Sequence, residues 1–248
     1  MTTTSDSTVI KDNVKKAYNS ISGTYSEWTE THHEKRIKYL NLLLDHLSHG
    51  MSHQEERPNS VKSVLELGCG SGQPVTAILA STQTSNVEPT PRFQVIGNDI
   101  SAQQLKLASQ TLKSVGNVEL REGDMMELSF GDESLDAVLG MYAIIHLPRD
   151  EQSILLKRIH TWLKPGGYFL GNFAAEELGA LYDENWLGCD VDKGAMFWSS
   201  WGEEGTLRIL AEIGFDVVLR DNSTDIEDGK NGEKDEVPFL WVLAKKNI

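Results

Sequence analysis

Three glycines occupy alternate positions after an apolar segment: Gly68, Gly70 and Gly72. The apolar segment ends in a carboxylate, Glu66, and a helical pattern follows the glycines. A strand, a turn without side chains and a helix N-terminus are typical of a loop in which a ligand lies against bare backbone. Dinucleotide-binding loops need Gly-x-Gly-x-x-Gly, and here Gln73 stands at the third glycine position. The spacing therefore favours a nucleotide-type ligand other than a dinucleotide, although a plain strand–helix turn is the alternative.

Two acids, Asp99 and Asp124, stand where later apolar segments end. In open α/β sheets, ligands bind at the carboxyl ends of the strands. A carboxylate at that edge can accept hydrogen bonds from both hydroxyls of a ribose, and Met125 can lie on an aromatic ring. Taken singly, each acid is equally well explained as a helix cap or a turn residue. Their order behind the glycine turn favours a ligand-binding role.

A third group of reactive side chains follows the fourth apolar segment, which leads to Tyr142 and His146. A histidine whose pKa lies near 6.5 is suited to accept a proton close to neutrality. A structural histidine explains His146 equally well. Residues 174–202 are rich in aromatics, including Trp198 and Trp201, and we expect them near Tyr142. They would suit a planar, hydrophobic or cationic ligand, or they form the core of a covering layer.

Alternating strands and helices must position these residues. The apolar patterns predict strands at 61–67, 93–98, 118–121, 168–173 and from 135, with helices at 74–80, 101–114 and 149–163. This alternation is typical of a parallel sheet with helices on both faces. Two later strands, at 214–220 and 238–244, have no helix between them, so the last strand should be antiparallel. The sequence predicts an α/β fold with a Rossmann-like, seven-stranded, mostly parallel sheet.

Segments outside this alternation complete the predicted organisation. Residues 1–10 are expected as a disordered tail, and residues 11–60 as an N-terminal helical lid, broken at Ser22-Gly23, with a linker. Residues 61–248 form the main domain, in which 174–202 is an insertion over the carboxyl edge of the sheet. The acidic stretch from Asp221 to Glu236 is expected as a solvated loop.

Composition limits the classes of function. The formal net charge of −14 argues against nucleic acid as the main partner, and no apolar run has the length of a membrane span. Two cysteines give neither a disulfide framework nor a zinc site, and no carboxylate set suits magnesium, so no metal is expected. The N-terminus lacks the pattern of a signal peptide, which leads us to expect a cytoplasmic protein. The oligomeric state is left open.

Five motifs, in this order, resemble those of the class I S-adenosylmethionine-dependent methyltransferases. They are Val-Leu-Glu-Leu-Gly-Cys-Gly-Ser-Gly, Gly-Asn-Asp-Ile-Ser, Glu-Gly-Asp-Met, Leu-Asp-Ala-Val-Leu-Gly with Ile-Ile-His-Leu, and Leu-Lys-Pro-Gly-Gly-Tyr-Phe. The resemblance runs from about Val61 to the C-terminus. The segment from Tyr18 to Tyr25 resembles the helical lid of small-molecule members, including those of quinone biosynthesis.

The resemblance implies S-adenosylmethionine as the cofactor. The glycines would approach its methionine part, Asp99 would hold its ribose, and Asp124 would hold its adenine. Glu66 would orient the turn or reach the cofactor's amino group, and Tyr25 would contact the cofactor carboxylate. The full implied set of cofactor contacts is Tyr25, Glu66, Gly68, Gly70, Gly72, Asp99, Ile100, Asp124, Met125 and Met141.

The resemblance further implies methyl transfer to a heteroatom, oxygen or nitrogen, of a small aromatic or hydrophobic acceptor. His146 is the candidate base, and Tyr142, His146, Trp198 and Trp201 are the candidate acceptor contacts. Proximity and orientation would supply most of the rate enhancement. A cofactor-binding regulator without activity and a protein methyltransferase remain alternatives, whereas Gln73 argues against a dehydrogenase.

Overall fold

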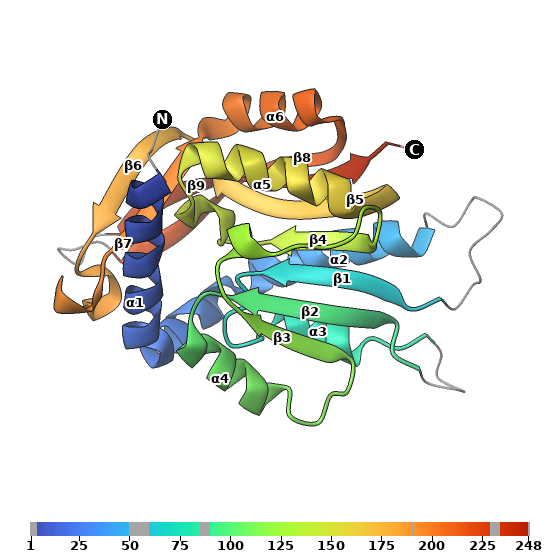
Figure 1. The fold of residues 1–248 in the computed structure, drawn as a ribbon, viewed down its shortest axis with the longest axis horizontal. Coiled ribbons are helices and arrows are strands. Elements are labelled where there is room, and N and C mark those ends of the chain that lie inside the picture. Colours follow the sequence, from blue (N-terminus) through green and yellow to red (C-terminus); the bar gives the residue numbers. More distant parts are fainter. Residues whose placement is uncertain (1–3, 50–59, 85–89, 190, 229–233, 248) are drawn as a thin grey trace.

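The computed structural model describes residues 4–49, 60–84, 90–189, 191–228 and 234–247. A seven-stranded sheet with the order β3-β2-β1-β4-β5-β9-β8 forms its centre (Figure 1). The strands are β1 (Lys62–Leu67), β2 (Phe93–Asp99), β3 (Val118–Glu122), β4 (Leu135–Gly140), β5 (Leu163–Ala174), β8 (Phe215–Asp228) and β9 (Lys234–Lys246). Only β9 runs against its neighbours. The predicted mostly parallel sheet with an antiparallel last strand is therefore confirmed.

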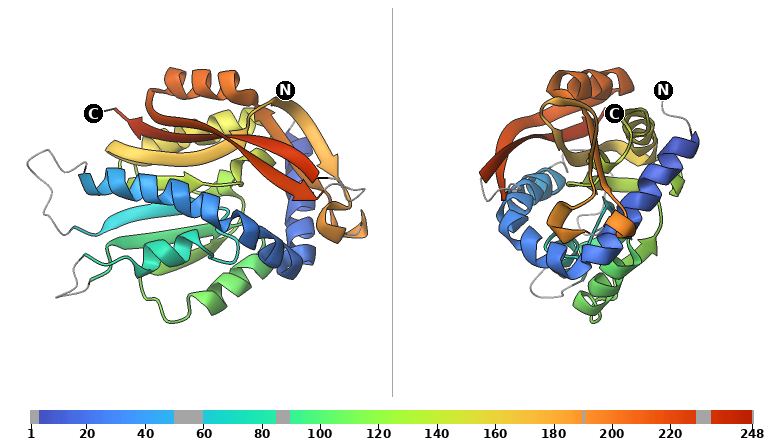
Figure 2. Two further views of the ribbon diagram at one scale, coloured as in Figure 1. Left: turned by 180° about the vertical axis from the view of Figure 1, so that it is seen from behind. Right: turned by 90° about the vertical axis from the view of Figure 1, so that its left-hand side faces the viewer.

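Helices cover both faces of the sheet because its strands carry apolar side chains on both sides. On one face, α2 (His33–His49) and α3 (Val75–Ser81) pack against the sheet through Tyr39, Leu43 and Leu79. On the other, α5 (Arg149–Trp162) and α6 (Gly202–Ile213) contribute Leu155 and Leu210. Figure 2 shows the first pair from behind. Helix α4 (Ala102–Thr111) follows β2, and Ser101 caps it as predicted, since its hydroxyl accepts from the Gln104 amide.

The order of the strands reverses between β1 and β4, which are neighbours although β2 and β3 lie between them in the chain. Such a reversal opens a crevice at the carboxyl ends of the strands. Two short 3-10 turns follow strands at this edge, η2 (Met125–Glu127) and η3 (Ile144–His146). Helix α1 (Thr4–Trp28) runs across the same edge (Figure 1). The fold therefore brings the strand-end motifs together beneath one helix.

The N-terminal segment differs from the prediction in two ways. Helix α1 begins at Thr4, where a tail through residue 10 was predicted, and it continues through Ser22-Gly23, where a break was predicted. Ile10 and Ile21 are buried in clusters with residues of a hairpin that follows β5, and this packing holds one continuous helix. The helical path changes only at η1 (Thr29–His32), which leads into α2.

Residues 174–202 form that hairpin. Its strands, β6 (Glu177–Asp183) and β7 (Met196–Trp201), are antiparallel and form a separate two-stranded sheet, with η4 (Trp186–Gly188) and η5 (Val191–Lys193) between them. The hairpin packs on α1 so closely that a Cβ at Gly194 would lie 2.3 Å from the Asn13 carbonyl oxygen. Only a glycine fits there, and the contact fixes the hairpin beside the strand ends.

The acidic stretch 221–236 does not form a solvated loop in its described part, and that prediction is wrong. Strand β8 continues to Asp228, and β9 begins at Lys234. The acids are matched by basic and hydroxyl groups of α2: Lys38 and Tyr39 bind Asp221, and Lys35 binds Asp225. Cross-strand pairing and these ion pairs together stabilise a strand that composition alone would not predict.

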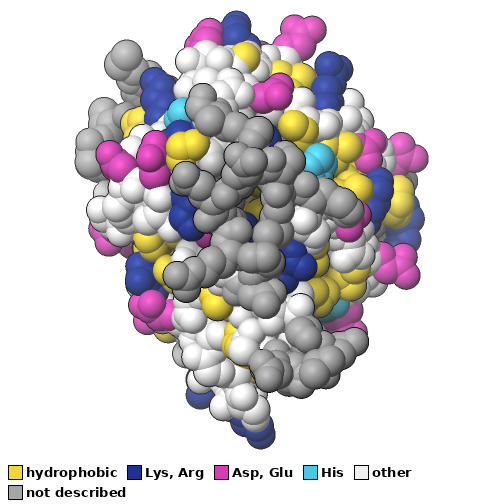
Figure 3. All heavy atoms as spheres, turned by 90° about the vertical axis from the view of Figure 1, so that its right-hand side faces the viewer, with side chains coloured by type: hydrophobic (Ala, Val, Ile, Leu, Met, Phe, Trp, Pro, Cys, Tyr) yellow, Lys and Arg dark blue, Asp and Glu magenta, His cyan; other side chains and the backbone are white. Residues whose placement is uncertain are grey.

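The end of the sheet opposite α1 is shown in Figure 3, where acidic and basic side chains are mixed among other residues. Among the described helices, none combines the length and the apolar character that crossing a membrane requires.

Candidate functional site

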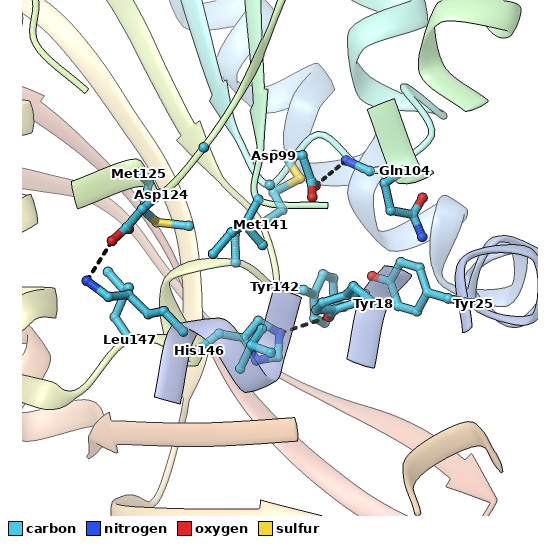
Figure 4. Close-up of a pocket in the computed structure, with 17 residues that line it drawn as sticks. Tyr18, Tyr25, Asp99, Gln104, Asp124, Met125, Met141, Tyr142, His146 and Leu147 are labelled. Atoms are coloured by element: carbon cyan, nitrogen blue, oxygen red, sulfur yellow. Dashed lines mark hydrogen bonds and ion pairs between the residues drawn. The ribbon is translucent and has the colours of Figure 1, made fainter. Parts of the chain in front are cut away.

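A cavity lies between α1 and the carboxyl ends of β1 to β4; we call it the first cavity (Figure 4). Ten residues singled out from the sequence line it: Tyr25, Gly68, Gly70, Asp99, Ile100, Asp124, Met125, Met141, Tyr142 and His146. Sequence reasoning missed seven others: Lys11, Val14, Tyr18, Gln104, Gly123, Ala143 and Leu147. The cavity holds about 60 Å³, below the ~300–1,000 Å³ of pockets that enclose small molecules. Helix α1 is therefore packed closely over it.

The glycine turn can approach the cavity because three of its residues have left-handed backbone angles, with φ of 68° at Gly68, 55° at Gly70 and 78° at Gly72. A Cβ at Gly68 would lie 2.6 Å from the Ala143 Cβ, so that position also needs glycine for packing. At Gly70 the nearest atom to a Cβ is the Gln104 Oε1, at 3.8 Å, across the cavity. The turn thus presents bare backbone to a ligand.

Asp99, at the end of β2, organises the turn. Its Oδ2 accepts from the Gly70 amide at 2.9 Å, and its Oδ1 accepts from the Ser101 amide at 2.8 Å. Burial raises the pKa of Asp99 to about 6, although amide hydrogen bonds from Ser101, Gly70 and Ile100 oppose the rise. A carboxylate has about four acceptor positions, so positions remain for a ligand's hydroxyl groups.

Asp124, at the end of β3, has two partners. Its Oδ1 accepts from the Met126 amide at 2.9 Å and so caps η2. The helix cap that was the alternative prediction for this acid is therefore present. Its Oδ2 pairs with Lys11 of α1 at 2.6 Å, and Lys11 also pairs with Glu151 at 3.2 Å. Asp124 is therefore both a structural cap and a charged group of the cavity that α1 contacts directly.

Two predicted cofactor residues lie outside the cavity lining. Glu66 is buried behind the turn, where it accepts from the Thr76 hydroxyl, and burial raises the pKa of Glu66 to about 8. Gly72 faces α4, since a Cβ there would lie 3.0 Å from Leu112. Both residues shape the turn from behind, through the strand–helix contact, and neither lines the cavity.

His146 lies in η3, and both of its ring nitrogens have partners. The Nδ1 lies 2.7 Å from the Phe197 carbonyl oxygen, which can only accept, so this nitrogen carries the proton. The Nε2 is then the acceptor for the Tyr18 hydroxyl at 2.9 Å. Burial lowers the pKa of His146 to about 4, which corrects the expectation of a base that titrates near neutrality. Tyr18 is the missed partner.

A layer of aromatic side chains closes the first cavity on the side of the hairpin, and we call it the aromatic wall. Its inner rings are Tyr18, Tyr25, Tyr142 and His146, and its outer rings are Trp28, Trp186, Trp198 and Phe239. Trp186 lies 5.8 Å from Tyr25, Trp198 lies 5.9 Å from His146, and Phe239 lies 5.1 Å from Tyr142, measured between ring centroids. Trp198 is thus close to the first cavity without lining it.

Trp201 does not belong to this group, and its predicted place near Tyr142 is wrong. Its Nε1 donates to the Arg149 carbonyl at 2.9 Å, and the Arg149 guanidinium lies 4.6 Å above its ring. The residue ends β7 and lines a separate surface hollow together with Glu177. Strand alternation explains the difference, because Trp198 and Trp201 are three residues apart and point to opposite faces of the hairpin.

Tyr142 sits in a polar network that the sequence did not reveal. Its φ of 54° is unusual for a residue with a side chain, and its hydroxyl donates to Asp225 at 2.8 Å. The buried Arg36 lies 4.6 Å over its ring. Asp225 belongs to the stretch predicted as a loop, and Arg36 to a helix with no motif. Only the tertiary fold brings them to Tyr142.

Within the described ranges, no three His, Cys, Asp or Glu side chains are grouped as metal ligands would be. A buried acceptor instead faces the first cavity: the Oε1 of Gln104 lacks a hydrogen-bond partner among the described residues. A buried acceptor without a partner costs free energy, which a donor on a bound ligand would recover. The two carboxylates, Met125 and the bare glycine backbone together fit an adenosine-containing ligand that also carries an amino acid group.

Comparison with known families agrees with this geometry. The family model that describes a methyltransferase domain matches residues 64–167, which contain the glycine turn, both strand-end acids and His146. The sterol 24-C-methyltransferase of Clavispora lusitaniae is 25% identical over 240 residues, covering 93% of this chain and 59% of that protein. The demethylmenaquinone methyltransferase of Staphylococcus carnosus is 36% identical over 77 residues, or 31% of each chain. This chain thus spans less than two thirds of the length of these relatives.

A solved structure with the same fold is the Burkholderia thailandensis 1,6-didemethyltoxoflavin-N1-methyltransferase, bound to 1,6-didemethyltoxoflavin and S-adenosylhomocysteine. Its TM-score is 0.55 at 18% identity, covering 90% of this chain and 87% of that one. At this identity the likeness concerns the fold. The matched methyltransferase domain contains the strand-end motifs that build the first cavity, and residues 64–167 of this chain are therefore similar to the proteins that carry this domain.

Proposed function

We propose that this protein transfers the methyl group of S-adenosylmethionine to an oxygen or nitrogen atom of a small, apolar or aromatic metabolite. One observation carries the proposal: the glycine turn, Asp99, Asp124 and the Tyr18–His146 pair line a single cavity at the switch point of the sheet. When bound, the cofactor would supply an activated methyl group. The chain's own residues would bind, orient and exclude water, and these effects account for most of the acceleration in such transfers.

The strand-end residues are proposed to hold the cofactor. Asp99 would accept from the ribose hydroxyls, Asp124 and Met125 would flank the adenine, and the backbone at Gly68 and Gly70 would lie along the methionine part. Tyr25, Ile100 and Met141 complete the lining. The unpartnered Gln104 Oε1 supports a donor-bearing ligand beside the turn. Arg36 is buried beside Tyr142, and it supplies positive charge near the proposed position of the methionine carboxylate.

The Tyr18–His146 pair is proposed to take up a proton from the acceptor. The Tyr18 hydroxyl donates its hydrogen to His146 Nε2; of its two oxygen lone pairs, one can accept from the Tyr25 hydroxyl and the other from an O–H or N–H of the acceptor. As the nucleophilic atom gains positive charge, its proton becomes strongly acidic. A base whose pKa lies near 4 is then sufficient. The proton passes to the Tyr18 oxygen while the Tyr18 proton passes to Nε2.

The aromatic wall is proposed to seat the acceptor. Trp198 lies 5.9 Å from His146, and Tyr142 lines the first cavity together with His146, so a planar or apolar molecule could lie against them close to the proton-accepting pair. The solved protein of the same fold is named as an N1-methyltransferase, and this supports a heteroatom as the target.

Paired substitutions test the proton-accepting pair. Tyr18→Phe and His146→Gln should each lower turnover about 100-fold, the usual contribution of general base catalysis. The affinity for S-adenosylhomocysteine should stay within about threefold, because neither change removes a proposed ribose or adenine contact. An acceptor screen that detects released S-adenosylhomocysteine measures turnover, and Tyr168→Phe, whose ring packs beside His46, is the control. Unchanged turnover in both variants would remove the pair from the reaction.

A further inference from the structure

A second cavity lies on the outer side of the aromatic wall. It holds about 620 Å³, between the β6–β7 hairpin, the free end of the β8–β9 hairpin and Trp28. This volume is within the ~300–1,000 Å³ of pockets that enclose small molecules. The two hairpin ends lie side by side in both views of the ribbon (Figures 1 and 2). Ile145, the residue before His146, belongs to its lining, and Trp198, which also lines it, lies 5.9 Å from His146 between ring centroids.

The residues of β9 that line the second cavity change from aromatic to acidic along the strand. Phe239, Val237 and Asp235 are alternate residues of β9, so they share one face, and all three line the cavity. Phe239 lies beside Tyr142 and the first cavity. Asp235 is exposed at the far end and pairs across the strands with Glu227. The lining therefore changes from aromatic to acidic over four residues, or about 13 Å.

The acidic end carries negative charge without basic residues in its lining. Asp183, Glu227 and Asp235 line the cavity, and among the described lining residues there is no Lys, Arg or His. Burial raises the pKa of Glu227 to about 7, and the charges of Asp225 and Asp235 add to the rise. A nearby cation stabilises the ionised form of such a carboxylate. The tryptophans of the aromatic wall and Tyr182 supply ring faces that also attract a cation.

We propose that the second cavity holds the body of the methyl acceptor, and that the acceptor is an elongated apolar molecule with an ammonium group at the end remote from the methylated atom. The apolar body lies along Trp198, Val237 and Phe239, and the ammonium group lies between Glu227 and Asp235. The proposal rests on the proposed function, because it takes the methylated atom to lie at the Tyr18–His146 pair. It adds charge and length to the description of the acceptor.

Three probes of equal length test the charge preference: n-decylammonium, n-decanol and n-decanoate. Their binding can be followed by quenching of tryptophan fluorescence, since Trp28, Trp186 and Trp198 line the cavity. The unmodified protein should bind decylammonium at least about tenfold more tightly than decanol, and decanoate most weakly. The double variant Glu227→Gln, Asp235→Asn should bind decylammonium and decanol with equal affinity.

Glu236→Gln is the matched control. Glu236 is exposed and adjacent to Asp235, but strand alternation places it on the opposite face of β9, so its loss changes the net charge and not the cavity. This variant should keep the preference for decylammonium. Equal binding of amine and alcohol by the unmodified protein, or a preference that persists in the double variant, would overturn the proposal.

S-adenosylhomocysteine titrated against the same proteins separates the two levels of inference. All three proteins should bind it with the same affinity, because none of the changed residues lines the first cavity. Cofactor binding without an amine preference would defeat the acceptor proposal and leave the proposed function in place. Absence of cofactor binding in the unmodified protein would defeat the proposed function itself.

Discussion

Individual residues of the first cavity have both a proposed binding role and a structural role. Asp99 fixes the glycine turn through Gly70 and caps the start of α4 through Ser101, with the same carboxylate that is proposed to hold the ribose. Asp124 caps η2 and pairs with Lys11. The sequence could predict these acids because each stands at a strand end. Tyr18 was not among the predicted site residues, since a tyrosine at helical spacing gives no sign that its hydroxyl binds a histidine from another element.

The protonation of Asp99 makes cofactor affinity depend on pH. Burial raises the pKa of Asp99 from an ordinary 3.8 to about 6. Because ionising the buried carboxylate is unfavourable, the free energy of unfolding decreases as the pH rises through about 6. The ionised carboxylate is the stronger acceptor for ribose hydroxyls. Affinity for S-adenosylhomocysteine should therefore rise between about pH 5 and pH 7 and then level off. Calorimetric titration across this range measures the effect.

Asp99→Asn is the variant that checks this assignment. It should weaken binding by about 10- to 100-fold near neutrality, the loss of one or two charge-assisted hydrogen bonds, and it should flatten the pH dependence. If the variant kept both the affinity and its pH dependence, Asp99 would not contact the ligand.

Gly68 and Gly70 should differ in their tolerance of a side chain. Gly68→Ala places a Cβ 2.6 Å from that of Ala143 at a left-handed φ, whereas Gly70→Ala adds only the conformational strain. We expect Gly68→Ala to cost about 2–4 kcal/mol and Gly70→Ala about 1 kcal/mol in the free energy of unfolding. Urea unfolding compares them. Equal losses would show that the close approach of the turn to Ala143 is not a constraint.

Among the elements, α1 contributes most to closing the site. It contacts the strand-end region through Lys11 to Asp124, Lys15 to Glu122 at 2.9 Å, and Asn19, which accepts from the Ser101 hydroxyl at 2.8 Å. Lys11, Val14, Tyr18 and Tyr25 are spaced on one helical face, and this face lines the cavity. That spacing was visible in the sequence, but predicting a tail and a break hid its continuity.

Weakening one contact of α1 should speed the exchange of ligand. The Lys11–Asp124 pair is partly buried, with exposed fractions of 15% for both side chains. Lys11→Gln should therefore lower the free energy that holds α1 over the cavity by roughly 0.5–1 kcal/mol. Association and dissociation of S-adenosylhomocysteine should both become about two- to fivefold faster, as stopped-flow fluorescence would measure. Lys106→Gln, an exposed change on α4, should leave both rates unaltered. Unchanged rates in Lys11→Gln would mean that α1 does not control access.

The β8–β9 hairpin shows what composition cannot predict. A stretch of seven acids looks like a solvated loop, yet Asp225 is buried and binds Tyr142 and Lys35. The partners come from α2 and from the end of β4, elements that are distant in sequence. The regular alternation of strands and helices, by contrast, is a local pattern, and it sufficed to predict a mostly parallel sheet with an antiparallel last strand.

On the scale of the whole molecule, two cavities lie on opposite sides of the aromatic wall. The first is built from the ends of β1 to β4 and from α1, and the second from the two hairpins of the C-terminal half. The sequence motifs describe the first, because short segments at strand ends carry its chemistry. The second has no motif, because its lining is assembled from many separate elements: α1, η3, β5, β6, η4, β7, β8 and β9. This division explains why the cofactor could be predicted from sequence and the acceptor could not.

The most direct test of the central claim is hydrogen exchange of the whole chain with and without S-adenosylhomocysteine, alongside a parallel titration with NAD. We predict saturable binding of S-adenosylhomocysteine and none of NAD, with new protection at residues 66–72, 99–101, 123–126 and along α1. Binding that left these segments unprotected, or binding of NAD in place of S-adenosylhomocysteine, would contradict the account.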